Sequence, residues 1–241
     1  MSDADSNSEM DMKANRDNCI FIPDNFGNPL KEYCVPKCYA DDLDVVLVSQ
    51  GLIFDRIKKM AQLIHVDVGN APLTCLCVLK GSYRVFSALT EELIHLRQEC
   101  DYHLVPDFIR VQSYANTEST GRVDILGWEV LVPLRGENVL IVEDLIDTGL
   151  TMQCLLAKLA EERPASIRVA TLAIKRTENI KKYQPDYVGF SLPNKFVVGF
   201  GLDYNQHMRD LNHICVMNAQ GVDRYRDRPL SRQTSAVQNG K

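Results

Sequence analysis

The stretch from Val139 to Met152 constrains the fold of this chain of 241 residues more than any other. It begins with the apolar run Val-Leu-Ile-Val, and because three of these four residues are β-branched, the run predicts a buried strand at the centre of a sheet. After a short polar loop, the apolar period changes to that of a helix with one buried face. That face carries Met152, Leu155, Leu156 and Leu159. The stretch therefore predicts a strand–loop–helix unit of an α/β protein.

The loop between this strand and helix contains three carboxylates and a turn that suits a phosphate. Glu143, Asp144 and Asp147 fall within five residues, and Thr148 and Gly149 follow them. In open α/β sheets ligands bind at the carboxyl ends of the strands, and a helix start offers unpaired N–H groups to an anion. Acids beside a phosphate are reasonable if Glu143 and Asp144 face sugar hydroxyls or Mg2+. The loop indicates a ribose phosphate; a plain strand-to-helix connection with solvated acids is the alternative.

The order of five motifs resembles that of a known enzyme family. Residues 139–152 resemble the phosphoribosyl-pyrophosphate (PRPP) motif of type I phosphoribosyltransferases. With four further stretches they resemble the hypoxanthine-guanine phosphoribosyltransferases, from about residue 19 to about residue 226. The four stretches are Leu79 to Ser82 (LKGS), Val111 to Tyr114 (VQSY), Lys175 to Thr177 (KRT) and Pro193 to Asp210 (PNKFVVGFGLDYNQHMRD).

The resemblance implies the type I phosphoribosyltransferase fold, an α/β fold with a mainly parallel twisted sheet, flanking helices and a small hood. We expect one domain over residues 18–226, with the hood formed by its N-terminal part and by about 185–226. The tails, 1–17 and 227–241, lack a core pattern and are expected to be disordered. Apolar spacing predicts a helix around 53–64 and strands at 45–48, 73–79, 104–112, 167–174, 188–190, 196–198 and 213–217, those at 188–190 and 196–198 as short edge strands.

Three local features carry further expectations. Ser82 follows a predicted strand and is a good N-cap for the helix that begins there. Residues 113–130 show no clear element, and because such long connections are unusual in compact domains, we expect a lid over the site. From Val222 onward the chain carries four arginines and no core pattern, so we expect a disordered tail there, with a weak contact to an anion as the alternative.

The chemistry follows from the resemblance, which implies Mg2+-dependent transfer of the 5-phosphoribosyl group from PRPP to hypoxanthine and guanine. The products are IMP and GMP, with pyrophosphate leaving. The resemblance implies Asp147 as the general base at the imidazole ring of the purine. A carboxylate in water is a weak base, so this role requires a closed site that excludes water. From the residues alone, Asp147 is as well explained as an acid that stabilises a helix N-terminus.

The other site residues come from the same resemblance, motif by motif. The ribose and its 5-phosphate are assigned to the loop, that is, to Glu143, Asp144, Asp147, Thr148, Gly149, Leu150 and Thr151. Pyrophosphate is assigned to Lys80 and Gly81, where the family has a strained, often cis, peptide, and to Ser113, Tyr114 and Arg209. The purine is assigned to Lys175, Phe196, Val197 and Asp203, and Mg2+ to Glu143, Asp144 and Asp203. Lys175 as a donor to the 6-oxo group would select hypoxanthine and guanine over adenine.

Two positions depart from the family pattern. Leu150 stands where the family usually has lysine in the phosphate loop, and Gln112 replaces a lysine common in the vertebrate forms. Both changes remove positive charge near PRPP, so we expect an active enzyme with weaker PRPP binding. The competing interpretation is a catalytically weakened paralogue that binds nucleotide or PRPP and acts as a sensor. The intact Asp147 argues against that interpretation.

Composition limits the remaining possibilities. A net charge of −5 argues against a general nucleic-acid binder. The eight cysteines lack a zinc spacing, and Cys75 and Cys77 fall on one face of a strand, so we expect reduced thiols. His207 and His213 are expected to be surface or core residues, not metal ligands. We find no signal peptide, membrane span or Walker-type loop, and expect a cytoplasmic protein. The resemblance implies a homodimer or homotetramer.

Overall fold

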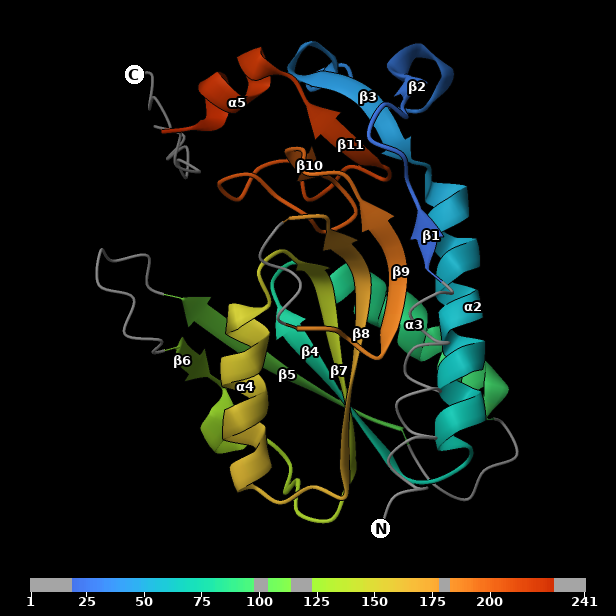
Figure 1. The fold of residues 1–241 in the computed structure, drawn as a ribbon, viewed down its shortest axis with the longest axis vertical. Coiled ribbons are helices and arrows are strands. Elements are labelled where there is room, and N and C mark those ends of the chain that lie inside the picture. Colours follow the sequence, from blue (N-terminus) through green and yellow to red (C-terminus); the bar gives the residue numbers. More distant parts are fainter. Residues whose placement is uncertain (1–18, 98–103, 114–122, 178–182, 228–241) are drawn as a thin grey trace, which may run out of the picture.

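A computed structural model describes residues 19–97, 104–113, 123–177 and 183–227. The main element is a seven-stranded sheet in the order β1-β9-β8-β7-β4-β5-β6 (Figure 1). Neighbouring strands are parallel, except for the antiparallel pair β5 and β6. The strands are β1 Ile20–Phe21, β4 Leu73–Leu79, β5 Leu104–Ser113, β6 Val123–Leu126, β7 Asn138–Ile146, β8 Ser166–Lys175 and β9 Tyr187–Leu192. The predicted mainly parallel α/β sheet is confirmed.

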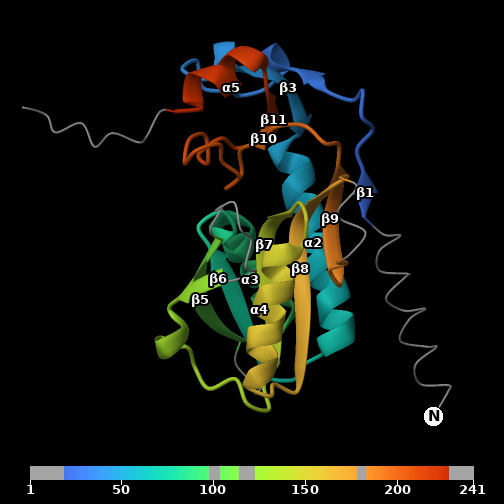
Figure 2. The ribbon, with the colours of Figure 1, turned by 60° about the vertical axis from the view of Figure 1, so that its left-hand side comes forward.

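Helices cover both faces of this sheet. Helices α2 (Gln50–Val68) and α3 (Tyr83–Leu96) lie on one face, and α4 (Leu150–Glu161) lies on the other (Figure 2). Alternate residues of β4 point to opposite cores: Cys75 packs with α2 and α3, whereas Leu76 packs with α4. Burial on both faces explains why the central strands read as unbroken apolar runs.

Strand β7 occupies the centre of the sheet, between β4 and β8. The residues from Val139 to Val142 are buried as predicted, and the strand continues through Glu143 and Asp144 to Ile146. The chain leaves β4 toward α3 on one face and leaves β7 toward α4 on the other. Adjacent strands whose helices turn to opposite faces leave a crevice at their carboxyl ends, where ligands bind in such sheets.

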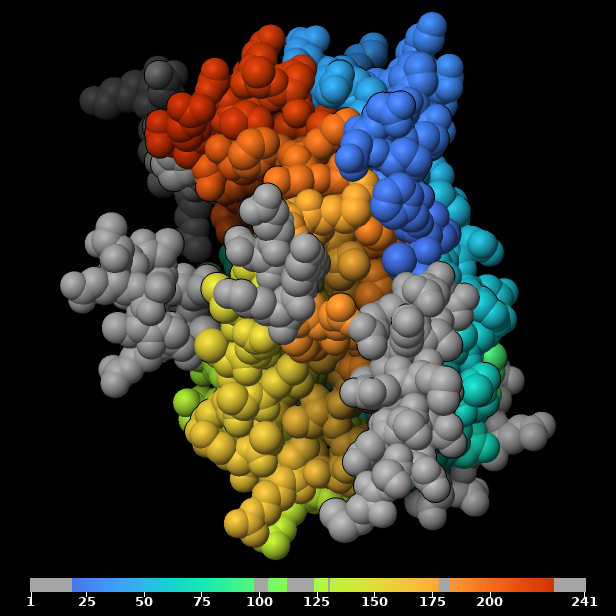
Figure 3. Space-filling view, in the orientation of Figure 1, coloured from blue at the N-terminus to red at the C-terminus, as the bar shows by residue number. Residues whose placement is uncertain are grey.

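A second sheet joins the two halves of the chain. It has the order β10-β11-β3-β2, with β2 from the N-terminal part and β11 from the C-terminal part paired to opposite edges of β3. These segments, blue and orange to red, form the upper part of the molecule (Figure 3). The strands are β2 Asn28–Pro29, β3 Leu43–Val48, β10 Val197–Val198 and β11 Ile214–Met217; the short helices nearby are η1 Leu30–Glu32, η2 Ala40–Asp42 and α5 Ala219–Tyr225.

The segment from Val222 differs from its prediction, because it contributes to helix α5. Tyr225 is buried and its hydroxyl donates to Asp42 Oδ2 at 3.2 Å. Arg224 pairs with the same carboxylate at 2.8 Å, and Asp42 itself is fully buried. One buried acid in η2 therefore anchors the helix. The two adjacent residues Arg224 and Tyr225 are too short a pattern to reveal this contact in the sequence.

Two other local expectations are corrected. Part of the segment 113–130 is regular, since β6 pairs with β5 and η3 (Trp128–Val130) follows it; residues 114–122, with the expected lid, lie outside the described residues. Strand β9 is not an edge strand, because β1 pairs with it. The predicted tails lie outside the described residues, apart from Asp227. In the part of the chain that is described, no helix has the length and hydropathy of a membrane span.

Candidate active site

Three strands bring the predicted site residues to one edge of the sheet. Strands β4, β7 and β8 are neighbours and parallel, so the segments after their carboxyl ends lie together. Lys80 and Gly81 follow β4, Asp147 follows β7, and Thr177 lies beyond β8. Three motifs separated by many residues in the sequence thus meet at the crevice between β4 and β7.

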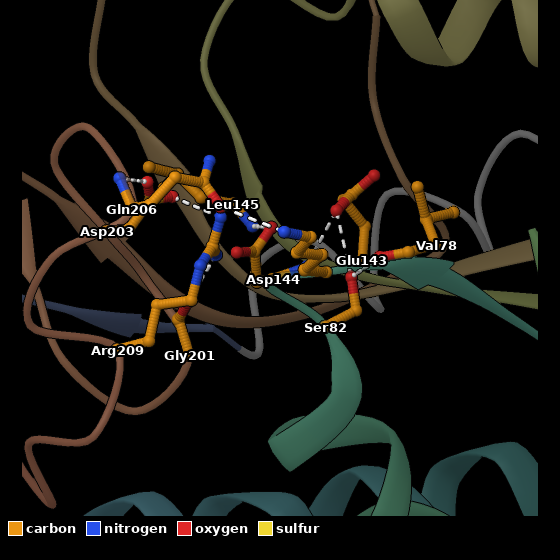
Figure 4. A network of polar contacts seen from close by, with 10 residues as sticks. Val78, Ser82, Glu143, Asp144, Leu145, Gly201, Asp203, Gln206 and Arg209 are labelled. Carbon is orange, nitrogen blue, oxygen red and sulfur yellow. Dashed lines mark hydrogen bonds and ion pairs between the residues drawn. The ribbon is translucent and has the colours of Figure 1, made fainter. Parts of the chain in front are cut away.

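Glu143 and Asp144 form a close acidic pair at the end of β7 (Figure 4). Glu143 Oε1 accepts hydrogen bonds from Ser82 Oγ at 3.0 Å and from the Asp144 amide at 3.1 Å. Burial raises the pKa of both carboxyls, and repulsion from Asp144 raises the pKa of Glu143 further. Such a pair favours a bound cation or hydroxyl donors in front of it, because either would stabilise the charged form.

Ser82 does not cap helix α3 with its side chain, in contrast to the prediction. Its hydroxyl lies 2.6 Å from the Val78 carbonyl and 3.0 Å from Glu143, and no side-chain capping bond is formed. A serine at this position therefore ties the start of α3 to the acidic pair. The capping pattern in the sequence could not distinguish the two uses of the hydroxyl.

Gly81 is required by its contact with the acidic pair. A β-carbon built there would lie 1.6 Å from Asp144 Oδ2 and 3.1 Å from Arg209 Nη1. No side chain fits in that space, so the backbone of this loop lies directly against the carboxylate. The peptide bond between Leu79 and Lys80 is cis, one bond before the Lys80-Gly81 position that the resemblance indicated.

The phosphate loop leads directly into helix α4. Gly149 has a φ of +77° and its carbonyl accepts the first helical bond, from Gln153, at 3.0 Å. A β-carbon at Gly149 would lie 2.6 Å from Tyr183 Cβ, so that tyrosine packs over the loop. Leu150 begins the helix with its side chain 58% exposed, and Thr151 lies in the first turn. The early N–H groups of a helix lack intrahelical partners, which suits an anion.

Asp147 and Lys175 lie together beside this loop. The Lys175 ammonium is 3.7 Å from Asp147 Oδ2, and the two side chains are 13% and 49% exposed. The Thr177 hydroxyl donates to the Asp147 carbonyl at 3.2 Å, which fastens the loop to the segment after β8. The half-exposed carboxyl is accessible to a ligand.

Asp203 and Arg209 form an ion pair in the loop between β10 and β11. Arg209 Nη2 is 2.6 Å from Asp203 Oδ1, and Nη1 donates to the Gly201 carbonyl at 2.6 Å. The Gln206 amide donates to Asp203 Oδ2 at 2.6 Å. Lys80 Nζ donates to Gln206 Oε1 at 3.3 Å, which links this loop to the end of β4. The motif predicted Asp203 and Arg209, but nothing in it singled out Gln206.

The structure describes some of the remaining predicted site residues and not others. Phe196 is 56% exposed with its ring edge-to-face on Tyr204 at 5.7 Å, and Val197 is buried in β10. Ser113 ends β5; its side chain, like that of Gln112, and all of Tyr114 lie outside what the structure describes.

Other features lie apart from these residues. A cavity of about 520 Å3 lies beside α4, lined by Trp128, Cys154 and Lys158 among others, away from the carboxyl edge. Within the described ranges, no three His, Cys, Asp or Glu side chains gather as a metal cluster. His213 is buried and its Nδ1 accepts from the Gln50 amide at 2.9 Å, as expected for a core histidine.

Comparison with known proteins identifies the family of this chain. Residues 47–205 match the family model described as the phosphoribosyl transferase domain. The chain is 43% identical over 222 residues to phosphoribosyltransferase domain-containing protein 1 of Xenopus tropicalis, covering 91% of this chain and 99% of that protein. It is 43% identical over 217 residues to hypoxanthine-guanine phosphoribosyltransferase of Bos taurus, covering 89% and 100%.

A solved structure confirms the fold. The structure of hypoxanthine-guanine phosphoribosyltransferase from Schistosoma mansoni in complex with IMP matches with a TM-score of 0.71 and 35% identity, over 86% of this chain and 99% of that one. The sheet, its flanking helices and the smaller antiparallel sheet are those of the type I phosphoribosyltransferase fold. The chain therefore belongs to the phosphoribosyltransferase family.

Proposed function

We propose that the protein transfers the 5-phosphoribosyl group of PRPP to hypoxanthine and guanine, forming IMP or GMP and pyrophosphate. The observation that carries this proposal is the Asp147–Lys175 pair, held 3.7 Å apart at the start of the phosphate loop. An acid that served only to stabilise the helix would not need a cation from a neighbouring strand. The relatives named hypoxanthine-guanine phosphoribosyltransferase support the same reaction.

One part of the loop binds the 5-phosphate and another part binds the ribose. The residues from Asp147 to Thr151 bind the 5-phosphate through backbone N–H groups and the threonine hydroxyls, because the start of α4 favours an anion. Glu143 and Asp144 accept hydrogen bonds from the ribose hydroxyls. We assign pyrophosphate to Lys80, and the close fit of Gly81 against Asp144, which brings this loop beside the acidic pair, supports the assignment.

Asp147 and Lys175 act on the purine. The Lys175 ammonium donates to the 6-oxo group, and Asp147 accepts the proton from the imidazole ring as the new bond forms at the anomeric carbon. Adenine presents an amino group to Lys175, which leaves donors facing each other and disfavours it. Phe196 offers an exposed ring for stacking on the base.

The donor set fits Mg2+, which prefers carboxylate and phosphate oxygens and retains several waters. Glu143 and Asp144 would hold one ion, and Asp203 a second. When bound, Mg2+ neutralises charge on the departing pyrophosphate. Few protein ligands are needed because the substrate supplies oxygens, which agrees with the lack of a three-residue cluster in the described residues.

The experiment is steady-state formation of nucleotide from PRPP and Mg2+ with hypoxanthine, guanine, xanthine and adenine in parallel. We expect turnover with the first two bases, and a fall in kcat of about 10²–10⁴-fold in Asp147→Asn. Asp55→Asn, an exposed aspartate on α2, is the matched control and should keep full activity. Wild-type activity that Asp147→Asn retains would contradict the role of Asp147.

A second candidate is a nucleotide-binding protein with slow turnover, which acts as a sensor. The specific observation in its favour is the apolar, exposed Leu150 where a phosphate is expected. Tight binding of GMP or IMP without measurable turnover would support it over the enzyme. We further propose that the protein is cytoplasmic and forms a homodimer or homotetramer. Light scattering of the purified protein would test the oligomeric state.

A further inference from the structure

Gln206 contacts the two groups to which we assign pyrophosphate and metal. Its side-chain oxygen accepts from Lys80 Nζ at 3.3 Å. Its backbone amide donates to Asp203 Oδ2 at 2.6 Å, and Figure 4 shows these two residues side by side. Lys80 follows β4 of the main sheet, whereas Asp203 lies in the loop between β10 and β11. One residue therefore bridges the two halves of the site.

The backbone around Gln206 is held in an unusual conformation. Gln206 and Met208 have φ values of +70° and +67°, which long side chains adopt only when the surroundings enforce them. Asn205 has a φ of +49°, a conformation that asparagine tolerates better. Two sets of hydrogen bonds fix this turn. The Gln206 backbone amide donates to Asp203, and the Asn205 side-chain Nδ2 donates to the Tyr225 and Arg226 carbonyls. The Gln206 carboxamide is thus presented toward Lys80 by a constrained backbone.

Packing beneath the turn keeps it close to the β4 loop. A β-carbon at Gly201 would lie 2.1 Å from the Gly81 carbonyl, so the two loops touch backbone to backbone. Arg209 adds its bonds to Gly201 and Asp203 from the other side. The Lys80 ammonium is exposed to solvent, and a flexible exposed lysine gains a preferred direction only from an acceptor such as Gln206.

We propose that Gln206 is a positioning residue for pyrophosphate, which orients Lys80 and Asp203 together. The carboxamide is neutral, so it directs the ammonium without cancelling its charge, and a pyrophosphate oxygen can replace it. This inference rests on the proposed function, because pyrophosphate is a product of that reaction.

The test is a double-mutant cycle on pyrophosphate binding, measured by calorimetry with Mg2+ present. We expect Gln206→Ala to weaken binding about threefold and Lys80→Met about tenfold. The double variant should bind like Lys80→Met alone, because residues that act through one contact are not additive. A threefold loss from Gln206→Ala that persists in the Lys80→Met background would overturn the proposal.

Conservative variants separate positioning from a structural role of the turn. Gln206→Glu keeps an acceptor oxygen at the same reach but places a negative charge beside Lys80, so it should bind pyrophosphate more weakly than Gln206→Ala. The shorter Gln206→Asn should behave like Gln206→Ala. In Gln206→Ala the KM for hypoxanthine should not change. An equal rise in the KM for PRPP and the KM for hypoxanthine would indicate a distorted turn instead. Gln62→Ala, at an exposed glutamine of α2, is the control.

The cycle also separates this proposal from the proposed function. Wild-type turnover together with an additive cycle would refute the role of Gln206 alone. No turnover and no pyrophosphate binding in the wild type would refute the proposed function and, with it, this inference.

Discussion

Leu150→Lys is the substitution that we expect to strengthen PRPP binding. Leu150 is the first residue of α4 and is 58% exposed, so a lysine fits there without displacing buried atoms. An exposed ammonium near the 5-phosphate is worth about 0.5–1 kcal/mol, less than a buried contact because water screens it. That free energy corresponds to a fall in the KM for PRPP of roughly two- to fivefold.

The same lysine should destabilise the free protein. A cation at a helix N-terminus opposes the helix dipole by about 0.3–1 kcal/mol, and leucine and lysine have similar helix propensities, so the change reports electrostatics. In a domain of this size it lowers the Tm by about 1–4 °C. Tighter substrate binding combined with a lower Tm is a signature that a general improvement in folding would not produce.

The assay measures initial rates against PRPP at saturating hypoxanthine and Mg2+, and thermal unfolding without ligand. Leu150→Met, which keeps size and neutrality, is the control and should match the wild type in both. The gain from lysine should shrink between about 0.05 and 0.5 M salt as screening increases. An unchanged KM for PRPP in Leu150→Lys, or an equal fall in Leu150→Met, would refute the reasoning.

Three further substitutions have defined outcomes. Burial raises the pKa of Glu143, so above the ordinary glutamate range the folded state holds a proton that the unfolded chain releases, and stability falls as pH rises. Glu143→Gln should therefore raise the Tm by about 2–4 °C near pH ~8 but not near pH ~4. The same substitution should lower activity. Asp42→Ala leaves Arg224 and Tyr225 without their acceptor and should lower the unfolding free energy in urea by about 2–3 kcal/mol, whereas the exposed Asp44→Ala should not. Phe196→Ala should raise the KM for hypoxanthine roughly five- to thirtyfold, with little change in Tm because the ring is exposed. An unchanged KM in Phe196→Ala, or an equal Tm response of Glu143→Gln at both pH values, would contradict the corresponding assignment.

Much of the fold was predictable because its strands are buried on both faces. Continuous apolar runs such as Val139 to Val142 leave little choice of structure, and the change to helical spacing after them fixes the strand–loop–helix unit. The site motifs could be placed as well, since each lies at the end of such a strand. The parallel order β8-β7-β4 then brings Lys80 and Asp147 to the same edge.

What the sequence did not predict depends on single contacts between distant segments. Ser82 was predicted as a helix cap because the local pattern is the same, and only the fold brings Glu143 within reach of its hydroxyl. Helix α5 forms on a short polar segment because Asp42, far away in the chain, is buried beneath it. Gln206 could not be predicted, because its two contacts depend on a turn in which its backbone has a positive φ, and the residue type gives no signal for that conformation.

The pairing of β3 with β11 has a consequence for synthesis on the ribosome. Val46 pairs with Cys215, so the smaller sheet cannot close until nearly the whole chain has emerged. The strands from β4 to β9 can pair earlier, because their partners are close in the order of synthesis. A chain terminated before Ile214 would leave the edge of β3 that faces β11 unpaired, and an unpaired apolar strand edge is a template for aggregation. Nonsense and frameshift changes late in the coding sequence are therefore expected to deplete the protein by misassembly and degradation, even where every residue of the phosphate loop is intact.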